Sequence, residues 1–131
     1  MTKTKAPSKT YSEKEYKEHG ETLFDIGKCQ AFQSVLKTDV VWCIDMPNED
    51  WNLDTVIIGD GSLKDITFEN PLVSYMNGVN ITAKAKDGTV KEVWLAANRA
   101  FKKAEKRCGD WHCYLESVEL LDGKIIAFYG S

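Results

Sequence analysis

Four Asp-Gly or Asn-Gly dipeptides divide this 131-residue chain from residue 60 onward. They are Asp60-Gly61, Asn77-Gly78, Asp87-Gly88 and Asp122-Gly123. A two-residue loop of this composition, between runs of alternating polar and apolar residues, is typical of the primed β-turn that joins two antiparallel strands. Because four such turns follow one another with short links, the sequence predicts an antiparallel β-meander.

The runs between these turns predict about seven or eight strands, a number that must curl or split into two layers. The expected strands cover residues 40–45, 55–59, 62–69, 79–86, 89–95, 113–121 and 124–129, with an eighth at 72–76. The last hairpin has apolar residues on both faces. Either the fold covers both faces, or one face is a partner surface, or a bulge near Leu120-Leu121 swaps the faces midway. Because the run 124–129 ends the chain, we expect it at a sheet edge that is open to pairing.

The residue pattern changes from strand to helix after residue 96. Ala97, Phe101 and Cys108 recur at helical spacing, and Gly109 can end the helix in a left-handed conformation. We therefore expect a helix over about 97–108. The side chains expected in the core come from the strands and this helix: Trp42, Ile57, Ile81, Trp94, Phe101, Leu115 and Ile126.

The N-terminal part of the chain predicts further helical segments. Ser12-Glu13-Lys14-Glu15 is a capping box that begins a helix. The segment 21–37 mixes strand and helix features; we assign about 28–37 to a helix, which Gly27 can separate from a short strand at 22–26. The expected fold class is α+β, with the helices closing the core of the sheet.

One α+β domain is expected over residues 11–131, after a flexible basic arm at residues 1–10. The arm contains three lysines, no acid and one proline, a composition that does not form a core by itself. The whole chain has 43% apolar and 28% charged residues, which is ordinary for a folded protein. Its net charge of −3 argues against a general nucleic-acid coat.

Localisation is predicted from two further features of the sequence. No apolar run approaches the roughly 18 residues of a membrane span, and the N-terminus lacks the apolar region of a secretory signal. The four cysteines are therefore expected as free thiols in a cytoplasm, that of the protein's own cell or of a host. A short chain with many hairpins, a basic arm and no catalytic signature is also typical of phage or viral accessory and virion proteins, although no motif matches one residue by residue.

The tripeptide Trp111-His112-Cys113 has the composition of a reactive site, because a thiolate needs a base or a cation nearby. Adjacent strand residues point to opposite faces, however, so His112 cannot serve Cys113, and a core role for Cys113 is favoured. No CxxC pair or other regular zinc-ligand spacing is present. We therefore predict no catalytic residue, no metal site and no cofactor.

Two groups of residues are candidates for binding. Trp51, within an acidic loop that includes Asp45 and Asp50, is either folded onto the core or an exposed contact anchor. The predicted helix carries a basic cluster, which either meets an acidic or phosphate-bearing partner or forms a solvated face: Arg99, Lys102, Lys103, Lys106 and Arg107. The solvated face is favoured, because Lys102, Lys103 and Lys106 lie opposite the Ala97/Phe101 stripe.

The leading functional hypothesis is a non-enzymatic interaction or assembly subunit. Its contacts with its own copies or another protein are expected through Phe128, Tyr129, Trp51 and the arm. The alternative is a small-ligand or nucleotide-binding domain, in which Trp51 or Trp111 stacks on the ligand and the helix binds phosphate. The residues expected for that alternative, besides the tryptophans, are Arg99, Lys102 and Lys103 in the segment 99–107; nucleic acid is possible but not favoured, and no membrane partner is expected.

Overall fold

The computed structural model describes residues 25–46, 50–71 and 80–130. The predicted arm at 1–10, the capping box at Ser12, the strand at 72–76 and the Asn77-Gly78 turn lie outside the described residues. Within the described part, no helix has the length and apolar character needed to cross a membrane.

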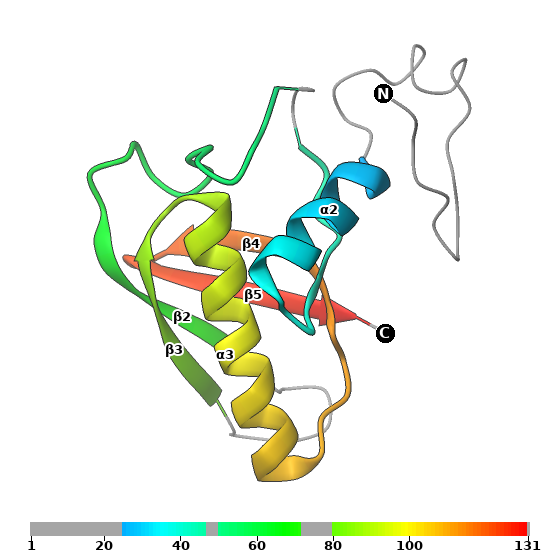
Figure 1. The fold of residues 1–131 in the computed structure, drawn as a ribbon. Helices are drawn as coiled ribbons and strands as arrows, with labels where there is room; N and C mark the ends of the chain where they lie inside the picture. The colour runs from blue at the N-terminus through cyan, green and yellow to red at the C-terminus, as the bar shows by residue number, and fades with distance from the viewer. Residues whose placement is uncertain (1–24, 47–49, 72–79, 131) are drawn as a thin grey trace.

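The described residues form two helices and five strands. They are α2 (Ile26–Leu36), β1 (Val41–Trp42), β2 (Lys64–Pro71), β3 (Asn80–Asp87), α3 (Val90–Cys108), β4 (Tyr114–Leu121) and β5 (Lys124–Gly130). The strands form one sheet in the order β1-β4-β5-β2-β3. Figure 1 shows this sheet curled like half a barrel, with α3 lying across it and α2 beside the β1 end.

The α+β class agrees with the sequence-based prediction, but the antiparallel meander of seven or eight strands is wrong. The described sheet is mixed, because β1 pairs parallel to β4 and β2 pairs parallel to β5. The antiparallel pairs are β2 with β3 and β4 with β5. As a result β5 lies between β4 and β2, and not at the sheet edge expected for the end of the chain.

Two of the predicted strands are apolar runs that lie mostly in loops. The predicted strand 55–59 contributes one isolated bridge, between Val56 and Thr89. The predicted strand 40–45 shrinks to the two residues of β1. The run 55–59 is held by a tertiary contact, since Ile57 and Ile58 donate their N–H groups to the Gly88 carbonyl. Asp60-Gly61 therefore turns a loop and does not join two strands.

The predicted strand 89–95 is instead the first part of α3, which begins seven residues earlier than expected. Thr89 is its N-cap, because its side chain accepts a hydrogen bond from the Glu92 N–H, and Glu92 adds an acid to the first turn. Asp87 accepts from the hydroxyl of Thr89 in turn. A Cβ at Gly88 would lie 2.0 Å from the Ile58 carbonyl oxygen, so the glycine permits a close approach of two backbones. Asp87-Gly88 is thus a strand-to-helix connection.

The predicted hairpin at Asp122-Gly123 is confirmed. Both residues have positive φ, 53° and 75°, as a type I′ turn requires. A register shift between Leu115 and Ser117 then changes which residues face the core. The irregularity predicted near Leu120-Leu121 therefore occurs near the start of β4. The face that carries Leu115, Ile125 and Ala127 is buried except at Leu120, which is 42% exposed.

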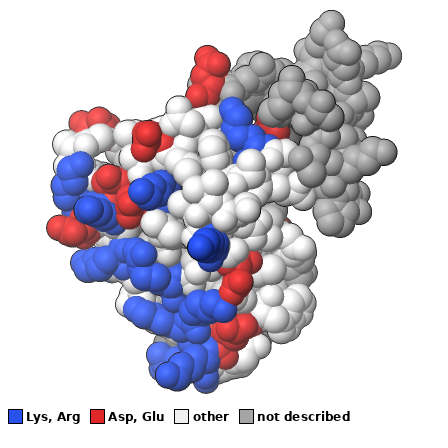
Figure 2. All heavy atoms as spheres, in the orientation of Figure 1, with Lys and Arg blue, Asp and Glu red and all other residues white. Residues whose placement is uncertain are grey.

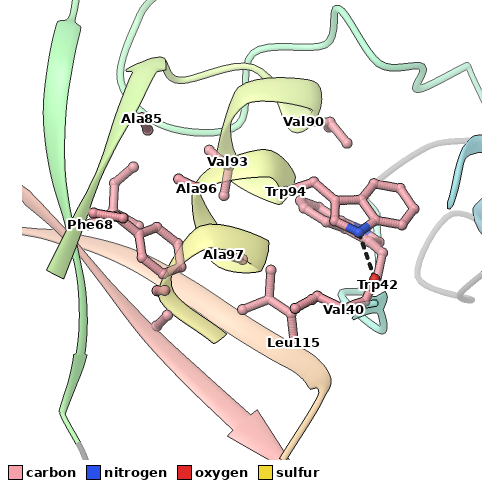
Figure 3. Packing of buried hydrophobic residues seen from close by; sticks show 14 of the residues in the cluster. Val40, Trp42, Phe68, Ala85, Val90, Val93, Trp94, Ala96, Ala97 and Leu115 are labelled. Atoms are coloured by element: carbon pink, nitrogen blue, oxygen red, sulfur yellow. Dashed lines mark hydrogen bonds between the residues drawn. The ribbon is translucent and has the colours of Figure 1, made fainter. Parts of the chain in front are cut away.

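The core lies between the concave face of the sheet and α3. Figure 3 shows Val93 and Ala97 of α3 on the side of Phe68 and Leu115, and Trp94 directed toward Trp42 and Val40. The helix presents four fully buried alanines, which allow the sheet to approach closely: Ala96, Ala97, Ala100 and Ala104. The expected core residues are buried except Ile57 and Ile126, which are half-buried. The predicted helix at 28–37 is confirmed as α2, although Gly27 lies within it and does not precede it.

The position of Thr89 provides a test of the helix start. Replacing Thr89 by Ala should lower the free energy of unfolding by about 0.5–2 kcal/mol, while Thr89→Ser should be nearly neutral, because serine also caps a helix. Urea denaturation measures both values, with Thr82→Ala on the exposed face of β3 as the control. Equal losses for Ala and Ser would contradict a capping role for the Thr89 hydroxyl.

Candidate functional site

The connection between α3 and β4 holds an aspartate and a histidine in contact. Gly109 ends α3 in the left-handed conformation, at φ 71°, and turns the chain toward β4. The Asp110 side chain is buried, and its Oδ1 lies 2.7 Å from Nδ1 of His112. Because a carboxylate only accepts hydrogen bonds, Nδ1 of His112 is the donor in this contact.

Trp111 is the exposed member of this connection. Its side chain is 65% exposed, and its ring stacks on that of His112 with 4.2 Å between ring centroids and 18° between planes. Asp110 thus positions His112, and His112 supports one face of the indole. Trp111 and His112 were candidates from the sequence, but Asp110 was not, although the Asp-x-His spacing was the available signal.

The thiols do not form the reactive site considered from the sequence. The structure describes all four cysteines as free thiols. Burial, with smaller effects from Glu116 and Cys113, raises the pKa of Cys43 from 9.0 to about 11. Burial is also the main cause of the raised pKa values of Cys29 and Cys113. A raised pKa keeps a thiol protonated, which is the opposite of what a nucleophile needs.

Trp51 is folded onto the core, and its side chain is only 3% exposed. Its ring contacts Phe32 edge-on at 5.5 Å and stacks with Trp42 at 6.4 Å. The Lys28 ammonium lies 5.3 Å from the Trp51 ring centroid and donates to the Trp51 carbonyl. Trp51 is therefore not available as a surface anchor or as a platform for a ligand ring.

A hollow of about 420 Å³ opens beside Trp51, where the end of β1 and the 50–57 loop approach β4. Its walls are mostly apolar and include Met46, Ile57 and Val118, with Asp45 and Thr55 as polar groups. Its volume is within the range of small-ligand sites. The loop residues 47–49 between two of its walls are not among those described.

The two C-terminal aromatic residues predicted to contact a partner point in opposite directions. Phe128 is 45% exposed on the outer face of the sheet. Tyr129 is on the inner face, where its hydroxyl donates to the Ala97 carbonyl of α3 at 2.7 Å, and burial raises its pKa. On the outer face, Tyr114 and Leu121 are also exposed, at 39% and 54%.

The predicted basic residues of α3 have two different environments. Lys102 contacts the carboxylates of Asp39 and Glu105, which raises its pKa. Arg99 and Lys103 instead reach the edge strand β3, where the Arg99 guanidinium donates to the Lys84 carbonyl and the Lys103 ammonium donates to the Thr82 carbonyl at 2.6 Å. The three residues expected to act together are thus divided between the two sides of α3.

Comparison with protein-family models, with curated proteins and with solved structures found no match. Among the residues described here, no three Cys, His, Asp or Glu side chains gather as a possible metal site. The candidate surfaces of the described residues are the hollow beside Trp51, the exposed face of the last hairpin, the basic side of α3 and the Asp110–His112 pair that supports Trp111.

The raised pKa of Cys43 leads to a prediction about thiol reactivity. At pH 8, iodoacetamide should alkylate Cys43 about 100-fold more slowly in the native protein than in guanidinium, because a thiol with pKa about 11 has that much less thiolate than one at 9.0. Peptide mapping by mass spectrometry gives both rates. The stability contributed by the protonated thiol should be complete below about pH 9 and lost as the pH rises toward 11. Equal native and denatured rates at pH 8 would contradict the burial of this thiol.

Proposed function

We propose that this protein is a non-enzymatic interaction or assembly subunit, and that the outer face of the β4–β5 hairpin is its main contact surface. The observation that supports this proposal is the unequal burial of apolar side chains on the two faces of the hairpin. On the inner face, Leu115, Ile125 and Ala127 are at most 1% exposed. On the outer face, Tyr114, Leu121 and Phe128 remain 39–54% exposed.

The outer apolar residues form one stripe because of the strand register. Tyr114 pairs with Gly130 and Ser117 pairs with Phe128, so Tyr114 and Phe128 are diagonal neighbours. Farther along the hairpin, Ile126 is opposite Glu119 and Leu121 is opposite Lys124. We call Tyr114, Leu121, Ile126 and Phe128 the outer stripe. An apolar centre with polar residues around it is the usual composition of a protein interface.

The sheet edges support contact through a face rather than by added strands. One edge strand, β1, has only two residues. At the other edge, β3, the Thr82 and Lys84 carbonyls are already occupied by Lys103 and Arg99. An incoming strand would have to displace these side chains, whereas a second sheet or a helix can pack on the outer stripe without breaking any hydrogen bond.

The predicted basic arm at residues 1–10 remains part of the proposal as a second contact. Exposed charges are screened within about 8–10 Å at ordinary ionic strength, so salt should weaken a contact by the arm but not burial of the outer stripe. Both proposed settings, a cytoplasm and a virion, supply neighbouring copies or partner subunits for such contacts.

Phe128→Asp tests the outer stripe. The parent protein should sediment as an oligomer, or retain a partner subunit in pull-downs, and Phe128→Asp should abolish either association because it buries a charge in the contact. Val35→Asp, on α2, is the matched control, since Val35 is 70% exposed outside the sheet and should leave association unchanged. Deletion of residues 1–10 should weaken association mainly at low salt.

A monomeric parent that retains no partner would refute the assembly proposal. A Phe128→Asp variant that associates like the parent would instead exclude the outer stripe as the contact. Thermal unfolding monitored by circular dichroism should show the same cooperative transition for both variants, which separates lost association from lost folding.

A further inference from the structure

A row of cations runs along one side of α3 and continues over the sheet edge. Arg99, Lys103, Lys106 and Arg107 are exposed on α3, and Lys84 and Lys86 are exposed on β3. The hydrogen bonds from Arg99 and Lys103 to β3 place the two elements side by side. Figure 2 shows Lys and Arg gathered in a band over this part of the molecule. We call these six residues the basic ridge.

Ridge residues form no ion pair within the described part of the chain. The carboxylates of Asp39 and Glu105 pair with Lys102 instead, while Asp87, whose pKa is lowered mainly by hydrogen bonds from Thr89, is also attracted by Lys86. Arg99 and Lys103 donate to backbone carbonyls, which fixes their positions but leaves their positive charge uncompensated. The Lys84 ammonium likewise donates to the Thr67 hydroxyl. Concentrated charge of one sign attracts an oppositely charged partner even when the whole protein is acidic.

The spacing of the ridge suits a partner whose negative charges repeat. Arg99, Lys103 and Arg107 follow one another at intervals of four residues, which is a rise of about 6 Å along a helix. Lys84 and Lys86 point to the same face of β3 and are about 6.8 Å apart along the strand. A polymer with one anion per unit can therefore contact several ridge cations in succession.

The exposed ring of Trp111 follows the ridge in the chain, four residues after Arg107. The other three tryptophans, Trp42, Trp51 and Trp94, are at most 3% exposed. One face of the Trp111 ring is covered by His112, which Asp110 holds in place, so the ring is positioned and its remaining surface is open. A positioned indole is a platform on which a flat ring can stack.

We propose that the basic ridge and Trp111 together bind single-stranded nucleic acid, with the ridge contacting phosphates and Trp111 stacking on one base. A nucleic-acid strand combines repeating phosphates with flat rings, and the ridge and Trp111 present the complement of both. An acidic peptide matches the charges but offers no repeating ring. A duplex matches the phosphates, but its bases are already stacked and not free to reach Trp111. The inference does not depend on the proposed assembly function.

Binding can be measured with a fluorescent oligothymidylate of about 16 nucleotides, the upper end of the site size for one single-strand-binding domain. The parent should bind it, with affinity that falls as salt rises. Lys106→Gln with Arg107→Gln is the main variant, because neither side chain makes a contact that holds the fold together. This double variant should bind more weakly, and its slope of log K against log salt should be shallower by about 1.4, at about 0.7 per lost phosphate contact.

Trp111 is tested separately from the charges. Trp111→Ala should weaken binding by roughly 5- to 150-fold and leave the salt slope unchanged, whereas Trp111→Phe should bind nearly as well as the parent. Oligothymidylate should also quench the fluorescence of the parent, in which only Trp111 is exposed, and should leave that of Trp111→Phe unchanged. Lys37→Gln, at the C-cap of α2, is the control for loss of one positive charge outside the ridge.

Three results would overturn the proposal. The first is no binding of the oligonucleotide by the parent at low salt. The second is equal binding by the double variant and Lys37→Gln, which would exclude the ridge. The third is binding of a poly-glutamate peptide that is as tight as binding of the oligonucleotide. Equal binding of single strand and duplex, by both the parent and Trp111→Ala, would have the same meaning. Either result would reveal a general anion surface for an acidic partner and not a site for a single strand.

Discussion

The packing of α3 inside the curled sheet is the contact on which the other features depend. Four alanines with no exposed surface let the helix lie close to β2 and β3, and larger residues fill the wider space toward β1. There the Trp94 indole N–H donates to the Val40 carbonyl at 2.8 Å, which connects α3 to the shortest strand of the sheet. Because the sheet curves around the helix, its inner face is enclosed along most of its length. The outer face receives no such cover from α3, and the outer stripe is the consequence.

The same packing explains why one side of α3 both contacts the edge of the sheet and keeps an exposed positive charge. An edge strand with unpaired carbonyls tends to add further strands, and proteins commonly prevent this with charged side chains. Arg99 and Lys103 do so here by donating to the edge carbonyls of β3. Since those acceptors are neutral, closing the edge does not use up the positive charge, in contrast to Lys102 with its two carboxylates. Protection of the sheet edge and a surface that attracts anions thus follow from the same two side chains.

The sequence predicts features fixed by local chemistry and fails where tertiary contacts decide. The Asp122-Gly123 turn was predictable, because both of its residues adopt positive φ regardless of what packs nearby. Asp87-Gly88 has the same composition, yet Thr89 and Glu92 begin a helix; apolar residues at 90, 93, 94 and 97 were the available helical signal. The parallel pairing of β5 with β2 joins segments more than 50 residues apart, and no local pattern encodes it. For the site, the exposure of Phe128 and the cations of α3 were foreseeable. The sequence left Trp51 either folded onto the core or exposed, and its contacts with Phe32 and Trp42 decide for the core.

The net charge of −3 affects how the proposed binding of nucleic acid to the basic ridge changes with salt concentration. The segment 80–108 holds eight Lys and Arg against three acids, so the rest of the chain is strongly acidic. Beyond about a Debye length, a nucleic acid meets mainly the acidic remainder and is repelled, whereas close to the ridge it is attracted. Added salt screens both effects, and the loss of repulsion partly offsets the loss of phosphate contacts. For a single variant, the slope of log K against log salt should therefore underestimate the number of phosphate contacts. The difference in slope between two variants is free of this error as long as the acidic remainder is unchanged, because the repulsion is then common to both.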